Sequence, residues 1–176
     1  MGLSQWFSTQ LEASADGFVW GVEQIPKERL YAPPPGPEGG LGEWVAARHA
    51  FHLLYYEREV ALPAMQHWLG GPNPSLDDYD EDVAWQNAPD LPTILREFHQ
   101  VRAAQIALLP RIDETRWHEA RETLWGSVTL RWVVSKTYQH TAEHINDVLR
   151  IALFWDLFAN RDLQRQQQER TSDETA

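Results

Sequence analysis

The sequence predicts an all-α protein with a single domain, folded as an antiparallel four-helix bundle. Three observations lead to this prediction. Apolar residues recur every three or four positions along four long segments, which is the spacing of one buried helix face. No segment shows the alternating apolar and polar pattern that is typical of a strand. The length of 176 residues suits one domain with its own core.

The first two helices are separated by a connection rich in proline and glycine. We expect the first helix from about residue 4 to residue 23, ending before Pro26, with an apolar face formed by Phe7, Leu11, Ala15, Phe18 and Val22. Residues 31–42 cannot continue a regular element because of their prolines and glycines. The second helix is expected from about residue 43 to residue 68, where Pro63 should kink it or mark its last turn.

The third helix has a well-defined start. An acidic run at residues 76–82 precedes it, and we expect this run to be a solvated loop. Asp90 is a suitable N-cap, and Pro92 falls in the first helical turn. Pro110 should end or bend this helix.

The fourth helix is the longest, and its apolar seam alternates steps of four and three residues. The seam consists of Leu130, Val134, Thr137, Thr141, His144, Val148, Ile151, Trp155 and Phe158. Its middle third is polar, although a bundle core should be driest there. Residues 161–176 are rich in glutamine and charge, so we expect a frayed helix end followed by disorder. The folded domain should therefore span residues 1–160.

The composition excludes several classes of function. Acidic residues outnumber basic ones by 26 to 15, for a net charge of -11, which argues against nucleic acid binding. The absence of cysteine excludes thiolate nucleophiles, disulfides and Cys-ligated metals. No apolar stretch is long enough for a membrane span, and the first residues do not resemble a secretory signal. We therefore expect a cytoplasmic protein.

Histidines provide the strongest functional signal. His140 and His144 are four residues apart on the fourth helix, so they share one face and can bind a single ion. His52 lies on or beside the inward face of the second helix and could meet this pair across the bundle. Three imidazoles would leave coordination positions open, as in catalytic zinc sites. A core histidine bonded to a glutamate or to the backbone explains His52 equally well. His49, one turn earlier, is an alternative ligand.

The remaining candidate residues are less specific. Glu57, Glu59 and Glu143 are possible orienters of a histidine ring, although Glu143 is also expected as a solvated helix charge. Three further histidines have no partner at metal-binding spacing and are expected to be surface or packing residues: His67, His99 and His118.

Two motifs, taken in order, resemble the DinB/YfiT-like family of small four-helix metal-binding proteins, which is unrelated to the DNA polymerase of the same name. His52-Leu-Leu-Tyr-Tyr-Glu57 is similar to the family's pattern on helix two, and His140-Thr-Ala-Glu-His144 is similar to its His-x-x-x-His on the last helix. The resemblance covers the chain from about Leu11 to Phe158. It implies that His52, His140 and His144 bind one divalent metal such as nickel or zinc.

The resemblance also implies a range of activities. Some relatives look like metal-dependent transferases that use a low-molecular-weight thiol, such as bacillithiol or mycothiol, and one is a maleylpyruvate isomerase. We therefore expect a metal-dependent transferase or hydrolase acting on a small molecule. The alternatives are a non-catalytic protein that binds a metal or a small molecule under stress, and a homodimeric interaction module whose interface uses the aromatic excess.

Overall fold

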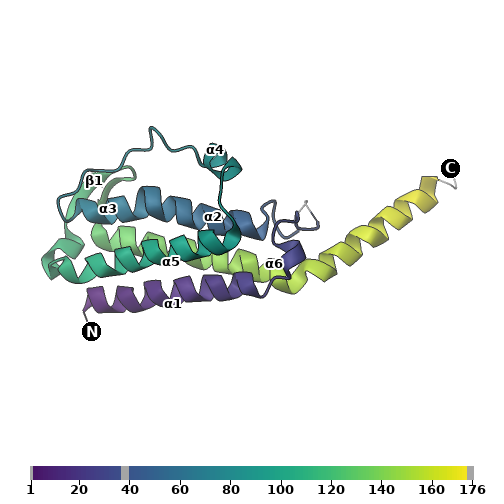
Figure 1. Ribbon diagram of the computed structural model, residues 1–176, viewed down its shortest axis with the longest axis horizontal. Helices are drawn as coiled ribbons and strands as arrows, with labels where there is room; N and C mark the ends of the chain where they lie inside the picture. The colour runs from purple at the N-terminus through teal and green to yellow at the C-terminus, as the bar shows by residue number, and fades with distance from the viewer. Residues whose placement is uncertain (1, 37–39, 174–176) are drawn as a thin grey trace.

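The computed structural model describes residues 2–36 and 40–173 and is mostly helical (Figure 1). The all-α class is thus confirmed at a coarse level. Helix α1 packs along α5 and α6, and α2 packs against the same two helices. Within the described residues, none of the helices is long and apolar enough to cross a membrane. The bounds of these four helices are Leu3–Glu23 for α1, Ala46–Tyr56 for α2, Leu91–Leu108 for α5 and Leu130–Asp173 for α6.

The second predicted helix forms as one continuous helical segment with a change of pitch. A π-helical turn, Glu57–Ala61, joins α2 to α3 (Leu62–His67), and the two helices lie in line (Figure 1). Pro63, the second residue after this turn, lacks the N–H that would bond to the carbonyl of Glu59. The wider π turn therefore accommodates Pro63 where a kink or a helix end was expected.

A small β-hairpin contradicts the prediction that the chain has no strands. Strand β1 (Ala120–Thr123) pairs antiparallel with β2 (Gly126–Thr129). Gly126 has a φ of +84°, which glycine adopts readily and which lets the chain turn tightly at the start of β2. Tertiary contacts fix the hairpin against α3, because Arg121 donates a hydrogen bond to the carbonyl of His67 at 2.6 Å.

Two further segments differ from the sequence prediction. A short helix, α4 (Glu81–Gln86), begins within the acidic run, and its N-cap Asp80 accepts a hydrogen bond from the N–H of Val83 at 3.0 Å. At the other end of the chain, α6 continues through Asp173 where fraying was expected from residue 161, and it extends beyond the other helices (Figure 1). Residues 161–173 contain neither proline nor glycine, so the backbone has no local reason to leave the helix. The rest of the predicted tail lies outside the described residues.

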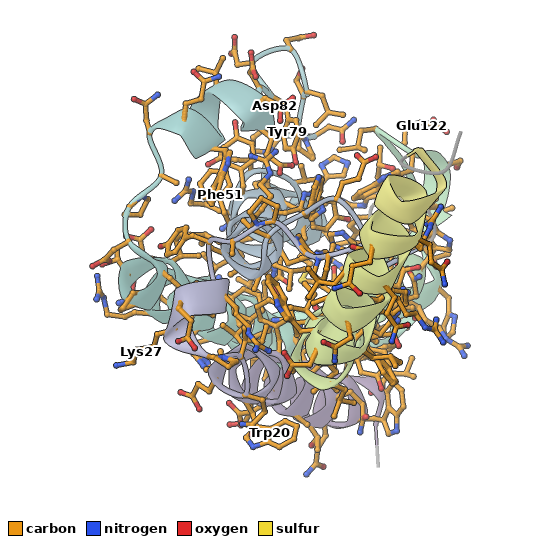
Figure 2. The ribbon with its side chains drawn as sticks, turned by 90° about the vertical axis from the view of Figure 1, so that its right-hand side faces the viewer. Trp20, Lys27, Phe51, Tyr79, Asp82 and Glu122 are labelled. Carbon is orange, nitrogen blue, oxygen red and sulfur yellow. The ribbon has the colours of Figure 1, made fainter. Side chains whose placement is uncertain are left out.

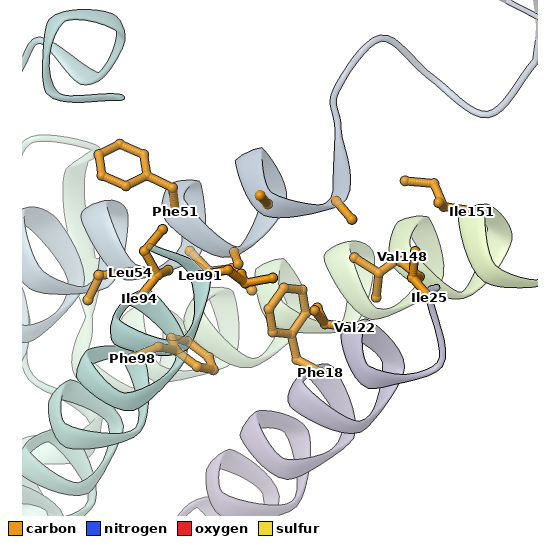
Figure 3. Packing of buried hydrophobic residues seen from close by; sticks show 14 of the residues in the cluster. Phe18, Val22, Ile25, Phe51, Leu54, Leu91, Ile94, Phe98, Val148 and Ile151 are labelled. Atoms are coloured by element: carbon orange, nitrogen blue, oxygen red, sulfur yellow. The ribbon is translucent and has the colours of Figure 1, made fainter. Parts of the chain in front are cut away.

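Two apolar clusters fill the interior. The larger one joins α1, α2, α5 and α6. Its centre includes Phe18 and Phe98, whose rings pack edge to face with their centroids 5.7 Å apart (Figure 3). Gly21 allows α1 to approach α6 closely, because a Cβ there would lie 3.0 Å from a methyl group of Val148. The smaller cluster lies towards the hairpin and contains Trp68 and Trp117.

A buried polar layer separates these two clusters along the helices. Its five side chains come from the π turn, α5 and α6, and each is at most 2% exposed: Glu57, Arg102, Gln105, Thr137 and Thr141. On α6 the layer falls between Val134 of the smaller cluster and Val148 of the larger one. The polar middle of the predicted seam is therefore a real feature of the core, and the histidines lie next to it.

Candidate metal centre

The structure brings His52, His140 and His144 together between α2 and α6. The Nε2 atoms of His52 and His140 are 3.0 Å apart, and those of His140 and His144 are 3.3 Å apart. A cation about 2.1 Å from each donor separates neighbouring donors by about 3.0 Å in octahedral and about 3.4 Å in tetrahedral geometry. The observed separations match this range, so the three residues could hold a metal ion.

Burial keeps the rings of His140 and His144 neutral, as metal ligands must be. Burial lowers the pKa of His140 to about 3, with repulsion from His52 acting in the same direction. Burial likewise lowers the pKa of His144 to about 2, assisted by repulsion from His140 and His49. Each of these uncharged rings has one nitrogen with a free lone pair at neutral pH.

Glu81 of α4 orients His52. One carboxylate oxygen of Glu81 lies 2.7 Å from Nδ1 of His52, so a proton on Nδ1 is held there and Nε2 is left as the lone-pair donor. The same carboxylate pairs with Arg48 at 2.9 Å and accepts a hydrogen bond from the hydroxyl of Tyr79 at 3.1 Å. Burial acts to raise the pKa of Glu81, but its contacts with His52 and Arg48 outweigh burial and lower the pKa overall.

The sequence prediction missed Glu81 because it lies in the acidic run that was expected to be a solvated loop. Figure 2 shows Tyr79 and Asp82, the neighbours of Glu81, on the side of the molecule above Phe51 of α2. Glu81 is 29 residues from His52, so no helical spacing relates the two. The only local signal was the N-cap Asp80, which marks the start of a helix in this run.

The glutamates proposed from the sequence lie elsewhere. Glu57 is fully buried in the π turn, where it is paired with Arg102 and accepts a hydrogen bond from Thr141 at 3.2 Å. Burial raises its pKa, although Arg102 opposes this. Glu57 contacts none of the histidines directly in these hydrogen bonds; its partner Thr141 adjoins His140 in the chain. Glu143 is exposed on α6, and Glu59 pairs with Arg58 on the surface.

His49 occupies the opposite side of His144 from the three converging Nε2 atoms. Its Nδ1 lies 2.9 Å from Nδ1 of His144, and burial lowers its pKa to about 4, with repulsion from His52 adding to the effect. The ring of Trp44 is parallel to that of His144, with centroids 6.2 Å apart. These side chains line a pocket of about 350 Å³ that also includes Asp147 and Arg150. His49 thus contacts a ligand candidate without replacing His52.

The remaining histidines lie outside this group. Nδ1 of His67 is 3.0 Å from the carbonyl of Gly71, which is a turn contact at the end of α3. His99 of α5 faces Asp16 at 4.0 Å and is 43% exposed. We refer below to His49, His52, His140 and His144 together as the histidine cluster. A site of this kind, with imidazole nitrogen donors and a carboxylate hydrogen-bonded to one of the rings, suits a borderline divalent cation such as zinc or nickel.

The histidine cluster lies within a segment that matches a known protein family. The family model described as the DinB superfamily matches residues 10–148, which include the whole histidine cluster. No curated protein and no solved structure matches the chain.

Proposed function

The chain belongs to the DinB superfamily, and we propose that it binds a divalent metal, zinc or nickel, through His52, His140 and His144 and acts on a small molecule. In this proposal the four long helices form an antiparallel bundle with the metal centre between α2 and α6. The observation that supports it most strongly is the convergence of three imidazole nitrogens at separations of 3.0 and 3.3 Å.

The ligand set favours catalysis over a purely structural role. Three protein ligands leave one or more positions for water or substrate, whereas structural sites are closed by four. A divalent cation there would supply Lewis-acid chemistry and lower the pKa of a water or thiol that binds to it. The protein side chains hold the geometry: Glu81 fixes the ring of His52, and Arg48 holds Glu81.

We propose two reaction classes, transfer from an external thiol and hydrolysis. The chain has no cysteine, so any thiol must be a separate molecule such as bacillithiol or mycothiol. We assign the protein to the cytoplasm, where such thiols stay reduced. The pocket of about 350 Å³ beside His144 is of a size that suits a small substrate.

Metal analysis of protein purified without a histidine tag tests the binding half of the proposal. After dialysis against zinc or nickel, the wild type should retain at least one equivalent. The His140→Gln variant, which removes the ring shared by both close Nε2 contacts, should retain about one equivalent less than the wild type. His99→Gln is a matched control, because it removes one histidine from an exposed position outside the cluster. Equal metal content in all three proteins would overturn the proposed site.

A separate assay tests the catalytic half. The zinc-loaded and nickel-loaded proteins are incubated with a nitrophenyl ester to detect hydrolysis, and with a bimane electrophile plus bacillithiol or mycothiol to detect thiol transfer. We expect turnover in one assay that disappears in the His140→Gln variant. A protein that binds metal but is inactive in both assays would leave a binding protein and overturn these reaction classes.

A further inference from the structure

We infer that the protein has a second divalent-cation site, formed by His49, His144 and Asp147, which shares His144 with the first site. Nδ1 of His144 is 2.9 Å from Nδ1 of His49 and 3.5 Å from a carboxylate oxygen of Asp147. The same oxygen is 3.8 Å from Nδ1 of His49. This inference builds on the proposed function, because the other nitrogen of His144 faces the first site.

The three separations are those of ligands around one ion. Donors about 2.1 Å from a cation lie about 3.0 to 4.2 Å apart, depending on the angle between them. A hydrogen bond would explain the contact between His49 and His144 alone. It does not explain Asp147, which is too far from both rings for a strong hydrogen bond yet close to both. Two imidazoles and a carboxylate are a donor set that suits zinc, copper or nickel.

The pocket provides independent support, because it opens onto this second group of residues. Among the residues that line the 350 Å³ pocket are His49, His144 and Asp147, whereas His52 and His140 are not part of its lining. The side chain of Asp147 is 33% exposed, against 8% for His49. Open coordination positions on a cation held here would therefore face the space that a small substrate can enter.

Occupation of both sites sets a requirement on His144. A neutral imidazole has one lone pair, so a cation on Nε2 leaves the ring proton on Nδ1. A second cation on Nδ1 would displace this proton to solvent, and His144 would then hold both cations as an imidazolate. The charge on Asp147 partly compensates for the added cation.

Zinc stoichiometry distinguishes the two sites. Tag-free protein is dialysed against micromolar free zinc, and bound zinc is counted by mass spectrometry for the wild type and four variants. The wild type should bind two equivalents. Asp147→Asn should bind one by losing the second site, and His52→Gln should bind one by losing the first. His144→Gln should lose both. Glu122→Gln removes an exposed charge on β1, far from the cluster, and should keep two.

Each alternative outcome is decisive. One equivalent that Asp147→Asn retains and His52→Gln loses would overturn the second site and leave the proposed function intact. One equivalent that Asp147→Asn loses and His52→Gln retains would overturn the first site, and with it the sharing of His144 between two sites. If His144→Gln fails to fold, as judged by circular dichroism, the other two variants still decide.

Copper provides a readout that only a bridging ring would change. Two copper(II) ions joined by an imidazolate couple magnetically, so the wild type loaded with two equivalents should give a weakened electron paramagnetic resonance signal. Asp147→Asn with one equivalent should give the full signal of an isolated ion. An uncoupled signal of two ions in the wild type would overturn the shared ligand.

Discussion

Removal of the Glu81 carboxylate should weaken metal binding without removing any ligand. Glu81 lies 2.7 Å from Nδ1 of His52, and its side chain is only 12% exposed, so water screens the contact poorly. Loss of a carboxylate that is hydrogen-bonded to a metal-bound histidine lowers the affinity for the metal by about 10- to 100-fold, which is about 1.4 to 2.7 kcal/mol of binding free energy. Glu81→Gln keeps a hydrogen-bond acceptor for His52, so we expect about 10-fold. Glu81→Ala loses both charge and acceptor, so we expect about 100-fold.

Competition with a chromogenic chelator measures this effect. Zinc affinity is determined at a fixed pH in the Asp147→Asn background, so that the site at His52 is the one titrated. Asp82→Asn is a matched control, because Asp82 adjoins Glu81 and also contacts Arg48, at 2.8 Å, but its side chain is 90% exposed. The control should stay within about 2-fold of its parent, because exposed ion pairs contribute little. If Glu81→Ala binds zinc as tightly as the control does, Glu81 does not support the site.

Three further predictions concern the stability of the fold. Arg102→Met should lower the free energy of unfolding by about 3 to 5 kcal/mol, because Glu57 is left buried without its ion-pair partner. Urea denaturation measures this change. Recovery of the lost stability in the double variant with Glu57→Gln would support the cause. The metal-free protein should lose stability as the pH falls from 7 to 5. In the folded state His49, His140 and His144 have pKa values of about 4 or below, so they stay neutral over this range. In the unfolded state their pKa returns to the ordinary value of 6.5, so the unfolded chain takes up protons and is favoured as the pH falls. Each such ring should contribute about 1 to 2 kcal/mol to the change. Urea denaturation at several pH values measures it, and a stability that does not vary with pH would contradict the buried, neutral state of His49, His140 and His144. Phe18→Ala should lower the free energy of unfolding by about 3 to 5 kcal/mol, because it leaves a cavity beside Phe98. A shift in melting temperature no larger than that of Trp20→Ala, at an exposed position, would show that the larger apolar cluster is not the core.

The helices and the pairing of His140 with His144 could be predicted because their signals are local, whereas His52 was assigned as a ligand from the family resemblance. The seam of α6 repeats over many turns, so Leu130 was identified as its start and His144 as an inward residue. The N-cap Asp90 and Pro92 fixed the start of α5 in the same way. A helix also places His140 and His144 on one face by geometry alone.

The parts that were missed depend on contacts between distant segments. Strands β1 and β2 have four residues each, too few for a periodic pattern, and contacts such as that between Arg121 and the carbonyl of His67 hold the hairpin in place. Glu81 acts on His52 across a loop. Glu57 follows His52 in a motif that suggests a role at the metal, but the π turn directs it to Arg102. Helical periodicity cannot predict a π turn, because it assumes constant pitch.

X-ray absorption spectroscopy of the zinc-loaded, tag-free protein tests the central claim most directly. We predict a first shell of nitrogen and oxygen donors at about 2.0 to 2.1 Å with no sulfur, and imidazole scattering beyond it. Both the bound zinc and the imidazole scattering should be lost in the His144→Gln variant. Zinc without imidazole scattering, or a spectrum unchanged by that substitution, would contradict a metal centre at the histidine cluster.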